Sequence, residues 1–348
     1  MKKIKIHGSG STSVILVGER ITKLSSYLPH GKAIIITDKN VHRLYHKELA
    51  GYPVIAIGLG EKNKTLQTVE YIYKKLVELE ADRSTFIAGV GGGIVCDITG
   101  FAASTYMRGL RFAFVPTTLL AQVDASIGGK NGVNFNGFKN MIGVFNQPEF
   151  VICDMKLLKT LPKKEILCGF GEIVKHALIA DANMFNFLEK NLRKALALNS
   201  RIIEELVYRS VVIKSDVVNQ DEREKGFRRI LNFGHTLGHA IEKCSDTYSH
   251  GEAISIGMLA ISALSVRKGW LNPEEYTRIE MLIRSIGLPV RVRIPASNIE
   301  AAMRKDKKRE GKSIHVVCLK GIGNPTVEKM DVGQLPALIK GTDVFCSP

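Results

Sequence analysis

In the first half of the chain, short apolar runs alternate with amphipathic stretches. The apolar runs predict buried strands at 33–37, 54–57, 84–90, 112–115 and 150–153. Apolar residues recur at helical spacing across 65–80 and again across 93–106, which predicts two helices. Alternation of strands and helices predicts a mainly parallel sheet with helices on both faces.

The pattern changes after about residue 157, where helical periodicity takes over. Amphipathic helices are predicted at 165–180, 184–198, 201–220, 231–243, 252–268 and 273–286. The expected fold is therefore an α/β, Rossmann-like N-terminal domain (1–156) followed by a mostly α-helical C-terminal domain (157–348). Ligands of such sheets bind beyond the carboxyl ends of the strands, so we expect the active site in a cleft between the domains.

Composition is ordinary for a globular enzyme and argues against several classes of protein. Apolar residues make up 45% of the chain, yet no run approaches the ~18 apolar residues of a membrane span. The Met1 end has no apolar core of a signal peptide. The six cysteines form no C-x-x-C pair, which argues against a disulfide framework and a cysteine zinc site. We therefore expect a cytoplasmic protein without a membrane partner.

The net charge of +15 raises the question of a polyanionic partner such as nucleic acid. Much of the excess lies in the run 304–309 and in helices that otherwise appear amphipathic, and no aromatic residues are interleaved with it. A small anionic substrate, together with a general basic bias, accounts for this pattern. We therefore expect no nucleic acid partner.

Three consecutive glycines, Gly91, Gly92 and Gly93, lie between a predicted strand and its helix. Such a turn lets the backbone approach a ligand, and the helix N-terminus behind it favours a pyrophosphate. The spacing is not G-x-G-x-x-G, so a simple tight turn stays an alternative. Asp38 and Asp97 are candidate acceptors for cofactor hydroxyls, or else helix caps and surface residues.

A glycine-rich segment with single lysines follows the strand at 112–115. That strand ends at two hydroxyls, Thr117 and Thr118, which are well placed for cofactor contacts. Small residues surround the lysines, which favours an anion-binding loop over an ordinary surface loop. The polar residues of the segment include Asp124, Lys130, Asn134, Lys139 and Asn140.

Histidines and a glutamate of the second half have the spacing of a metal site. His235 and His239 lie four residues apart and share a helix face, and His250 begins the next helix. Glu172, with Lys175 one turn further on, could complete a two-His, one-Glu set, which suits catalytic zinc. Histidines that simply hydrogen-bond within the core stay an alternative, and His239 could instead act as an acid or base.

Basic residues precede the predicted helix that carries His235 and His239. Arg228 lies between two further arginines, and Lys214 lies on the preceding helix. Solvated side chains at a helix end are the ordinary interpretation. Beside a metal site, the same residues could clamp a carboxylate or a phosphate.

Taken together, these segments resemble the motif series of 3-dehydroquinate synthases, in order and spacing from about residue 34 to 308. The matching segments are 91–97, 106–109, 116–124, 128–134, 139–143, 172–175, 231–242 and 250–253. Departures from the family pattern are Cys96, Asn131 and the segment Phe135-Asn136-Gly137-Phe138. None of them is at an expected catalytic position, although Cys96 could alter the NAD pocket.

The resemblance implies conversion of 3-deoxy-D-arabino-heptulosonate 7-phosphate to 3-dehydroquinate and phosphate, a step of aromatic amino acid biosynthesis in the shikimate pathway. The implied course is transient oxidation by NAD, phosphate elimination, reduction and an intramolecular aldol reaction. The implied cofactors are NAD and Zn²⁺, for which Co²⁺ could substitute, and the implied assembly is a homodimer.

The resemblance also implies a role for individual residues. The metal ligands would be Glu172, His235 and His250. The NAD contacts would be Asp38, Glu61, Lys64, Gly91, Gly92, Gly93, Asp97, Thr117, Thr118, Lys139 and Thr160. The catalytic residues would be His239, Lys130, Lys175 and Glu224. Substrate would contact Arg108, Asp124, Asn140, Lys214, Arg228, Asn232 and Lys307, with Arg108 reaching across the dimer interface.

Three other functions stay open at this point. A sister sugar-phosphate cyclase that makes an inosose or valiolone skeleton would share the fold, zinc and NAD. A metal-dependent polyol dehydrogenase would share the architecture, although the many lysines of phosphate-binding type count against it. A nucleic-acid-binding protein with an inactive enzyme fold is disfavoured by the intact Glu172, His235 and His250.

Overall fold

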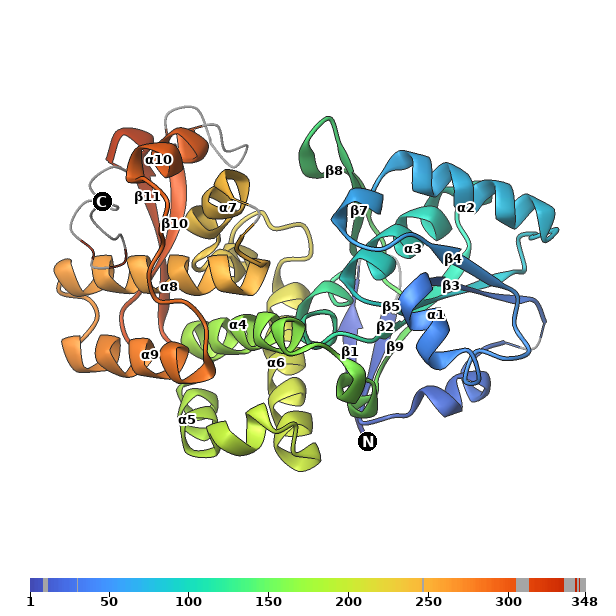
Figure 1. The fold of residues 1–348 in the computed structure, drawn as a ribbon, viewed down its shortest axis with the longest axis horizontal. Helices are drawn as coiled ribbons and strands as arrows, with labels where there is room; N and C mark the ends of the chain where they lie inside the picture. Colours follow the sequence, from blue (N-terminus) through green and yellow to red (C-terminus); the bar gives the residue numbers. More distant parts are fainter. Residues whose placement is uncertain are drawn as a thin grey trace. The chain divides into compact units, whose positions relative to one another are not determined.

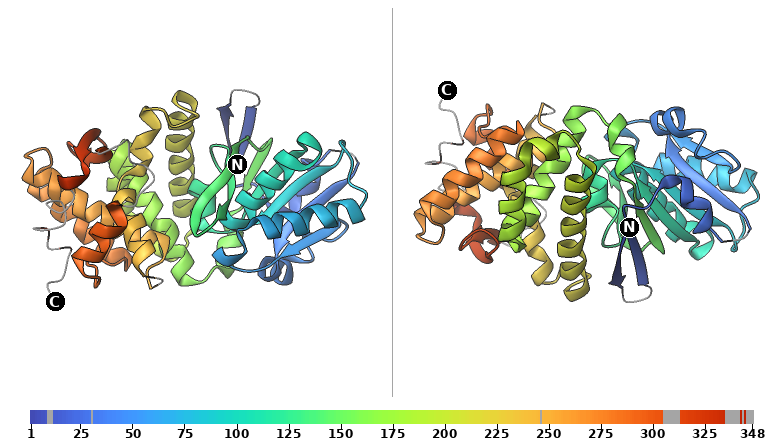
Figure 2. Two further views of the ribbon diagram at one scale, coloured as in Figure 1. Left: turned by 90° about the horizontal axis from the view of Figure 1, so that it is seen from above. Right: turned by 90° about the horizontal axis from the view of Figure 1, so that it is seen from below.

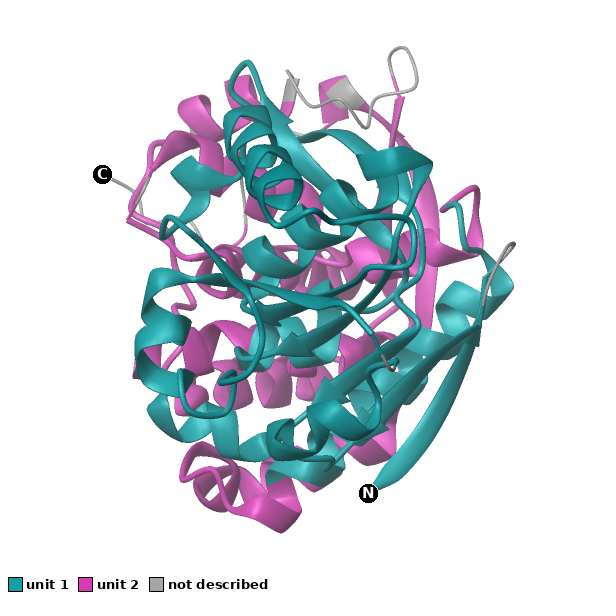
Figure 3. Ribbon diagram, turned by 90° about the vertical axis from the view of Figure 1, so that its right-hand side faces the viewer, with its two compact units in different colours: residues 1–162, 203–223 teal, residues 163–202, 224–348 magenta. Residues whose placement is uncertain are grey.

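The computed structural model describes residues 1–8, 12–29, 31–245, 247–304, 313–334, 342 and 344 (Figure 1). The chain divides into two compact units, which Figure 3 shows in different colours. Unit 1 comprises residues 1–162 and 203–223, and unit 2 comprises 163–202 and 224–348. Residues 203–223, which follow the boundary expected at 156, are thus grouped with unit 1.

Unit 1 is built on a seven-stranded sheet within the described residues. The strands run in the order β1 (Lys2–His7), β2 (Thr12–Val17), β9 (Phe150–Cys153), β6 (Arg111–Pro116), β5 (Phe86–Gly91), β3 (Ala33–Asp38) and β4 (Val54–Ile57). Neighbouring strands are parallel, except for β1 and β2. The mainly parallel sheet is therefore confirmed, and every strand predicted from an apolar run is present.

The β1–β2 hairpin lies at one edge of the sheet and was not predicted (Figure 2). In β1, exposed lysines alternate with more buried isoleucines. Lysines on an edge strand discourage pairing with other chains. So many charges within a short strand hid the alternation from a search for apolar runs.

Helices and a second hairpin pack around the sheet of unit 1. The helices are α1 (Lys39–Tyr45), α2 (Leu66–Glu78) and α3 (Gly93–Thr105), and α3 contacts β3, β5 and β6. Short 3₁₀ and π turns complete the unit at Ile21–Ser26, Glu61–Asn63, Tyr106–Arg108, Ala121–Ala125 and Met155–Thr160. The core of the sheet includes Leu16, Ile35, Phe86 and Ile152. Each such side chain contributes roughly 1.5–3 kcal/mol by leaving water.

The segment predicted as an anion-binding loop is instead a hairpin of β7 (Lys130–Phe135) and β8 (Phe138–Phe145). Its turn is Asn136-Gly137, and both residues have positive φ, at 47° and 76°. Asn-Gly with two positive φ angles is the favoured two-residue hairpin turn, because its twist matches that of the flanking strands. The signal was therefore present in the sequence and was missed.

Unit 2 is mostly helical, as expected. Its elements are α4 (Lys163–Ala180), α5 (Ala182–Leu196), a 3₁₀ turn (Phe227–Asn232), α7 (His235–Cys244), α8 (His250–Arg267), α9 (Pro273–Ile286), α10 (Ala296–Arg304), β10 (Ser313–Leu319), β11 (Pro325–Asp331) and a 3₁₀ turn (Val332–Gln334). Helix α6 (Ser200–Gln220) begins in unit 2 and continues in unit 1. Helix α8 is central, because it is buried along most of its length and contacts α4, α7, α9 and β10.

One predicted helix of unit 2 was wrong at its start. The segment 231–243 is interrupted at Gly234, which adopts a left-handed conformation with φ of 77°. Helix α7 therefore begins at His235, after a separate 3₁₀ turn. The β10–β11 hairpin was not predicted. None of the helices in the described part of the chain has the length and apolar character of a membrane span.

Candidate active site

Three side chains from three helices converge in unit 2. Glu172 lies in the middle of α4, His235 is the first residue of α7, and His250 is the first residue of α8. The Nε2 atom of His235 lies 3.7 Å from Oε1 of Glu172, and that of His250 lies 3.5 Å from the same oxygen. One ligand atom from each residue lies within 4.8 Å of the others. The structure thus brings together the three residues expected to bind metal.

The spacing of this metal-site triad (Glu172, His235 and His250) fits a shared ion better than direct hydrogen bonding. The two nitrogen–oxygen separations exceed the usual 2.7–3.2 Å of a hydrogen bond. Two ligand atoms at about 2.1 Å from zinc in tetrahedral geometry are roughly 3.4 Å apart. Two imidazoles and one carboxylate are also the donor set of catalytic zinc sites, in which a fourth position stays open.

The backbones of α4 and α8 meet beside two of the ligands. A Cβ atom added to Gly251 would lie 2.5 Å from Cα of Cys168, and one added to Gly171 would lie 3.0 Å from Cα of Gly251. Any side chain at these positions would push the helices apart. Because Gly171 precedes Glu172 and Gly251 follows His250, the crossing places the carboxylate and the imidazole next to each other.

A second close crossing places His235. A Cβ atom added to Gly257 of α8 would lie 2.0 Å from the carbonyl oxygen of Gly234, and one added to Gly234 would lie 2.7 Å from Cγ of Met258. Gly234 also supplies the left-handed turn from which α7 begins. All three residues of the triad are therefore sequence neighbours of glycines that allow helices to touch.

Further polar groups orient the imidazoles. Nδ1 of His235 lies 3.1 Å from the carbonyl oxygen of Phe233, and Nδ1 of His250 lies 3.3 Å from a carboxylate oxygen of Glu242. An Nδ1–H that donates to such an acceptor leaves Nε2 with a lone pair for a metal. Ser249 and Glu252 form a capping box that fixes the start of α8 at His250.

The charges of the site favour a metal-binding carboxylate. Burial alone would raise the pKa of Glu172, but the adjacent Lys175 ammonium and the imidazoles hold it well below its usual range. Burial, and after it the charge of Lys175, lowers the pKa of His235. Burial also opposes protonation of His250, yet the neighbouring carboxylates of Glu172 and Glu242 raise its pKa to about 9. His250 must therefore lose a proton to bind a metal at neutral pH.

Other predicted residues of unit 2 have different surroundings. The His239 ring lies 5.2 Å from that of His235 and 6.2 Å from that of His250, centroid to centroid. The side-chain amide of Asn232 donates to the Glu224 carboxylate at 2.5 Å. Arg228 is 98% buried, since 2% of its surface is exposed.

In unit 1, the glycine turn joins β5 to α3. Gly92 is the N-cap of α3, and the backbone N–H of Thr117 donates to the carbonyl oxygen of Gly91 at 2.8 Å. A Cβ atom on Gly91 would lie 2.5 Å from a side-chain carbon of Val95. The turn is therefore as tight as glycine permits, and it leaves the first N–H groups of α3 directed away from the helix for an anion.

A polar network lies beside this turn. Lys64, at the end of the 61–63 turn, pairs with the carboxylate of Asp97 on α3 and donates to Oδ1 of Asn140 on β8 at 2.5 Å. Lys64 is buried. Burial raises the pKa of Asp97, and the Lys64 charge opposes this effect. The structure thus brings together two residues expected to contact NAD and one expected to contact substrate.

The remaining predicted residues of unit 1 fall into three groups. Lys214 on α6 donates to Asp124 at its carbonyl and carboxylate oxygens, at 2.6 Å and 2.5 Å. Asp38, Thr118 and Thr160 take part in hydrogen bonds within unit 1: Asp38 caps α1, Thr118 accepts from the N–H of Ala121, and Thr160 bonds to Tyr45 at the end of α1. Those with exposed side chains are Glu61, Arg108, Lys130 and Lys139.

Lys307 lies outside the described residues. Two residues of the polar networks were given no role from the sequence, namely Glu242 beside His250 and Asn134 beside Glu61 and Asn140. Glu242 lies three residues after His239 on α7, so its position one turn along the same helix was a usable signal. No comparable signal exists for Asn134, whose partners come from distant parts of unit 1.

Comparisons with known proteins place both halves of the chain in one family. The family model for the 3-dehydroquinate synthase N-terminal domain matches residues 54–168, and that for the C-terminal domain matches residues 169–309. The 3-dehydroquinate synthase of Geobacter sp. (strain M21) is 43% identical over 317 residues, which cover 88% of each chain. That of Dehalococcoides mccartyi (strain ATCC BAA-2266 / KCTC 15142 / 195) is 41% identical over 342 residues, 94% of this chain and 95% of the relative.

Solved structures with similar folds include two other cyclases. A 2-deoxy-scyllo-inosose synthase complexed with carbaglucose-6-phosphate, NAD⁺ and Co²⁺ has a TM-score of 0.88 and 26% identity, over 98% of this chain and 100% of the other. The 2-epi-5-epi-valiolone synthase from Streptomyces hygroscopicus subsp. jinggangensis 5008, with NAD⁺ and Zn²⁺ bound, has a TM-score of 0.86 and 26% identity, over 97% and 98%. A probable glycerol dehydrogenase from Sinorhizobium meliloti 1021, at 17% identity and a TM-score of 0.71, shares the fold.

Proposed function

This chain belongs to the 3-dehydroquinate synthase family, and we propose that it converts 3-deoxy-D-arabino-heptulosonate 7-phosphate into 3-dehydroquinate and phosphate with zinc and NAD as cofactors. The observation that carries the proposal is the metal-site triad, in which two histidine nitrogens lie 3.7 Å and 3.5 Å from one oxygen of Glu172, close to the separation of two ligands of a tetrahedral zinc ion. The reaction makes the protein a phosphate-eliminating cyclase of the shikimate pathway, and we expect it in the cytoplasm.

Glu172, His235 and His250 would hold the metal, with the fourth position left for a substrate hydroxyl. When bound, zinc would supply a Lewis acid that lowers the pKa of that hydroxyl, and NAD would supply reversible hydride transfer, so that the net reaction is redox-neutral. Cobalt could replace zinc, since the same nitrogen and oxygen donors suit both ions.

NAD would bind at the turn Gly91–Gly93. The N-terminus of α3 offers N–H groups and a partial positive charge for the pyrophosphate. Lys64 and Asp97 lie beside the turn as a buried ion pair, and they would hold polar groups of the nucleotide. Asp38, Glu61, Thr117, Thr118, Lys139 and Thr160 complete the proposed set.

Substrate would be fixed through its two anionic ends. Lys214, Arg228 and Asn232 are assigned to the carboxylate, with Asn232 oriented by Glu224. The remaining substrate contacts are Arg108, Asp124, Lys130, Asn140, Lys175 and Lys307. Anchoring both ends aligns the reacting atoms and retains the intermediates. His239, whose imidazole lies next to the triad, is proposed to move a proton near the departing phosphate.

A homodimer is proposed together with Arg108. Arg108 is exposed on unit 1 and follows Met107, and both residues have positive φ, at 70° and 50°. Two successive non-glycine residues in this region are strained, by about 1–2 kcal/mol each. Such strain is typical of functional positions. We assign Arg108 to the substrate phosphate of the partner subunit.

The main rival is a sister cyclase that acts on a sugar phosphate without a carboxylate. The chain is 43% identical to a 3-dehydroquinate synthase, compared with 26% for the inosose and valiolone synthases. The guanidinium of Arg228, assigned to the substrate, has the fork geometry that binds a carboxylate through two parallel hydrogen bonds. A polyol dehydrogenase would accumulate NADH, which distinguishes it from either cyclase.

The test is to incubate the purified protein with the heptulosonate phosphate, NAD and zinc, and to follow phosphate and absorbance at the NADH wavelength together. Release of phosphate without net NADH is expected. A parallel incubation with glucose 6-phosphate tests the inosose reaction. Phosphate release from glucose 6-phosphate alone, or stoichiometric NADH, would overturn the proposal.

A further inference from the structure

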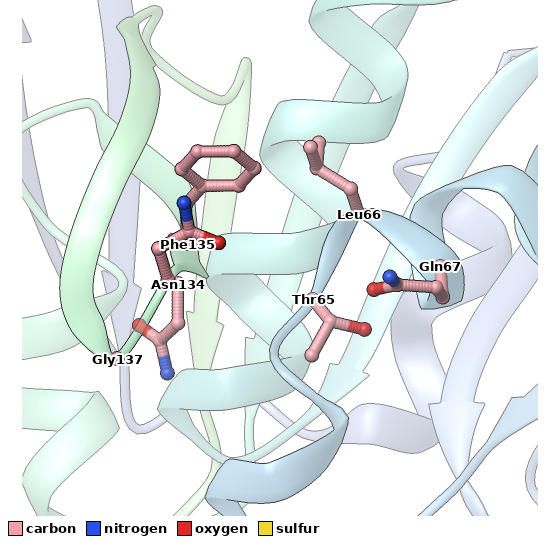
Figure 4. Close-up of a pocket in the computed structure, with 7 residues that line it drawn as sticks. Thr65, Leu66, Gln67, Asn134, Phe135 and Gly137 are labelled. Atoms are coloured by element: carbon pink, nitrogen blue, oxygen red, sulfur yellow. The ribbon is translucent and has the colours of Figure 1, made fainter.

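Asn134 lies at the end of β7, beside the segment that leads into α2 (Figure 4). In Figure 4 it borders a pocket between the β7–β8 turn and the start of α2. The pocket is lined by Thr65, Leu66, Gln67, Asn134, Phe135, Asn136 and Gly137. Asn134 is therefore at the place where the hairpin meets the segment that carries Glu61 and Lys64.

The two ends of the Asn134 amide have different partners. Its Nδ2 donates to Oε1 of Glu61 at 2.8 Å, and its Oδ1 accepts from the backbone N–H of Asn140 at 2.9 Å. A carboxylate can only accept, and a backbone N–H can only donate, so the partners fix the orientation of the amide. Asparagine carries this donor and this acceptor on separate atoms of one short side chain.

The backbone of Asn134 is held at the same place. Its N–H donates to the carbonyl oxygen of Lys64 at 2.8 Å, and its strand forms a parallel bridge with Thr65. The main chain thus fixes the distance between β7 and the 61–65 segment, and the side chain then reaches in two directions from a fixed point.

The contact with Asn140 stabilises a strained conformation. Asn140 has a positive φ of 51°, in the left-handed region that residues with a side chain disfavour. In that conformation its Oδ1 accepts a hydrogen bond from Lys64 at 2.5 Å. If the N–H of Asn140 lost its acceptor, the residue could relax and turn its amide away from Lys64.

We propose that Asn134 is a positioning residue that couples the NAD side of the site to the substrate side. This inference rests on the proposed function, in which Glu61 and Lys64 contact NAD and Asn140 contacts substrate. Through one amide, Asn134 orients Glu61 and holds the backbone of Asn140, whose side-chain Oδ1 accepts a hydrogen bond from Lys64. It touches neither ligand in this role.

Two substitutions separate the two ends of the amide. Asn134→Asp keeps an acceptor for Asn140 but places a carboxylate against Glu61, so NAD should bind about 10-fold more weakly while the KM for the heptulosonate phosphate changes less than about 3-fold. Asn134→Ala removes both contacts, and both constants should rise about 10-fold. NAD binding is measured by calorimetry, and KM by phosphate release.

A double-mutant cycle tests whether Glu61 is the partner. In the Glu61→Gln variant, the new side-chain amide can donate to an aspartate at position 134. Asn134→Asp should therefore lower NAD affinity less than about 3-fold in that variant, compared with about 10-fold in the wild-type protein. The control is Gln67→Ala, which alters the same pocket at an exposed position. It should leave NAD affinity and KM unchanged.

The outcomes distinguish the inference from the proposed function. If the wild-type protein neither binds NAD nor releases phosphate, the proposed function fails. If the wild-type protein is active but Asn134→Asp weakens NAD and substrate equally, or the cost is the same on both backgrounds, the inference alone is overturned. Should Asn134→Ala fail to fold, the double-mutant cycle of Asn134→Asp with Glu61→Gln still tests the contact between Asn134 and Glu61.

Discussion

In unit 2 the metal-site triad comes from helices that touch through glycine, whereas in unit 1 the polar side chains near the glycine turn are held mainly by one another. The triad depends on backbone contacts at Gly171, Gly234 and Gly251, where a side chain would force helices apart. The network of Lys64, Asp97, Asn134 and Asn140 depends on hydrogen bonds between a turn, a helix and a hairpin.

This difference suits the ligands that each region is proposed to bind. A metal ion needs donor atoms at fixed separations within a few tenths of an ångström, and packed helices provide such precision. A nucleotide offers many polar groups, so its site can tolerate small shifts. Substitution of a triad residue should therefore abolish metal binding outright, whereas substitutions in the network of unit 1 should weaken NAD binding by degrees.

The largest effect is expected for His250→Ala. Loss of one of three protein ligands should remove zinc and lower kcat on the order of 1,000-fold, while the fold persists because the imidazole is partly exposed. Bound zinc after dialysis, kcat and the far-ultraviolet circular dichroism spectrum are measured. His46→Ala, an exposed histidine of unit 1, is the control. Full activity in metal-depleted wild-type protein would contradict the zinc role.

Substitution of Arg228 tests the buried cation of the proposed substrate site. Arg228→Ala should raise the KM for the heptulosonate phosphate roughly 10- to 100-fold, because a charge-assisted hydrogen bond is lost. The dissociation constant of NAD should stay within about 2-fold. The nearby exposed Lys225→Ala serves as control. Equal losses for substrate and NAD would argue against the assignment to substrate.

A matched pair of glycine substitutions compares the two regions directly. In Gly251→Ala the new methyl group would meet the Cys168 backbone at 2.5 Å, so unfolding free energy should fall by about 1–3 kcal/mol and zinc affinity should fall with it. In Gly93→Ala the methyl group would meet the Cβ of Ala125 at 2.9 Å, so NAD affinity should fall while zinc binding persists. Denaturant titrations and metal analysis measure both. Similar zinc loss in the two variants would break the comparison.

The smallest effect is expected for Glu242→Gln. Wild-type zinc affinity should rise about 10-fold per pH unit from pH 6 until it levels off near pH 9, because His250, with a pKa of about 9, must release a proton. Glu242→Gln removes one cause of that raised pKa. The zinc affinity of the variant should therefore resemble that of wild type at pH 6 and level off at a lower pH. Above pH 9 it should be about 10-fold weaker than wild type, because Glu242 no longer orients the imidazole.

Competition with a chelating dye across this pH range measures both curves. The exposed substitution Glu78→Gln is a suitable control for loss of one negative charge. Parallel curves for wild type and Glu242→Gln would mean that Glu242 does not raise the pKa of His250.

Several features could be predicted from sequence because they depend on local patterns. The runs at 33–37 and 150–153 are apolar enough to require burial, so β3 and β9 were found. The helical spacing of 273–286 matches α9 at both ends, where Pro273 begins the helix and Gly287 ends it. The identity of the metal-site residues followed from residue type and spacing together with the family resemblance.

The chain alone thus determined which segments become buried strands and helices, and which side chains have metal-binding chemistry, because both properties reside in short stretches of sequence. Only the tertiary structure decided that Glu242 orients His250, that Asn134 joins Glu61 to Asn140, and that residues 203–223 pack with unit 1. These contacts join residues whose proximity depends on how helices and hairpins pack, and packing is a property of the whole chain.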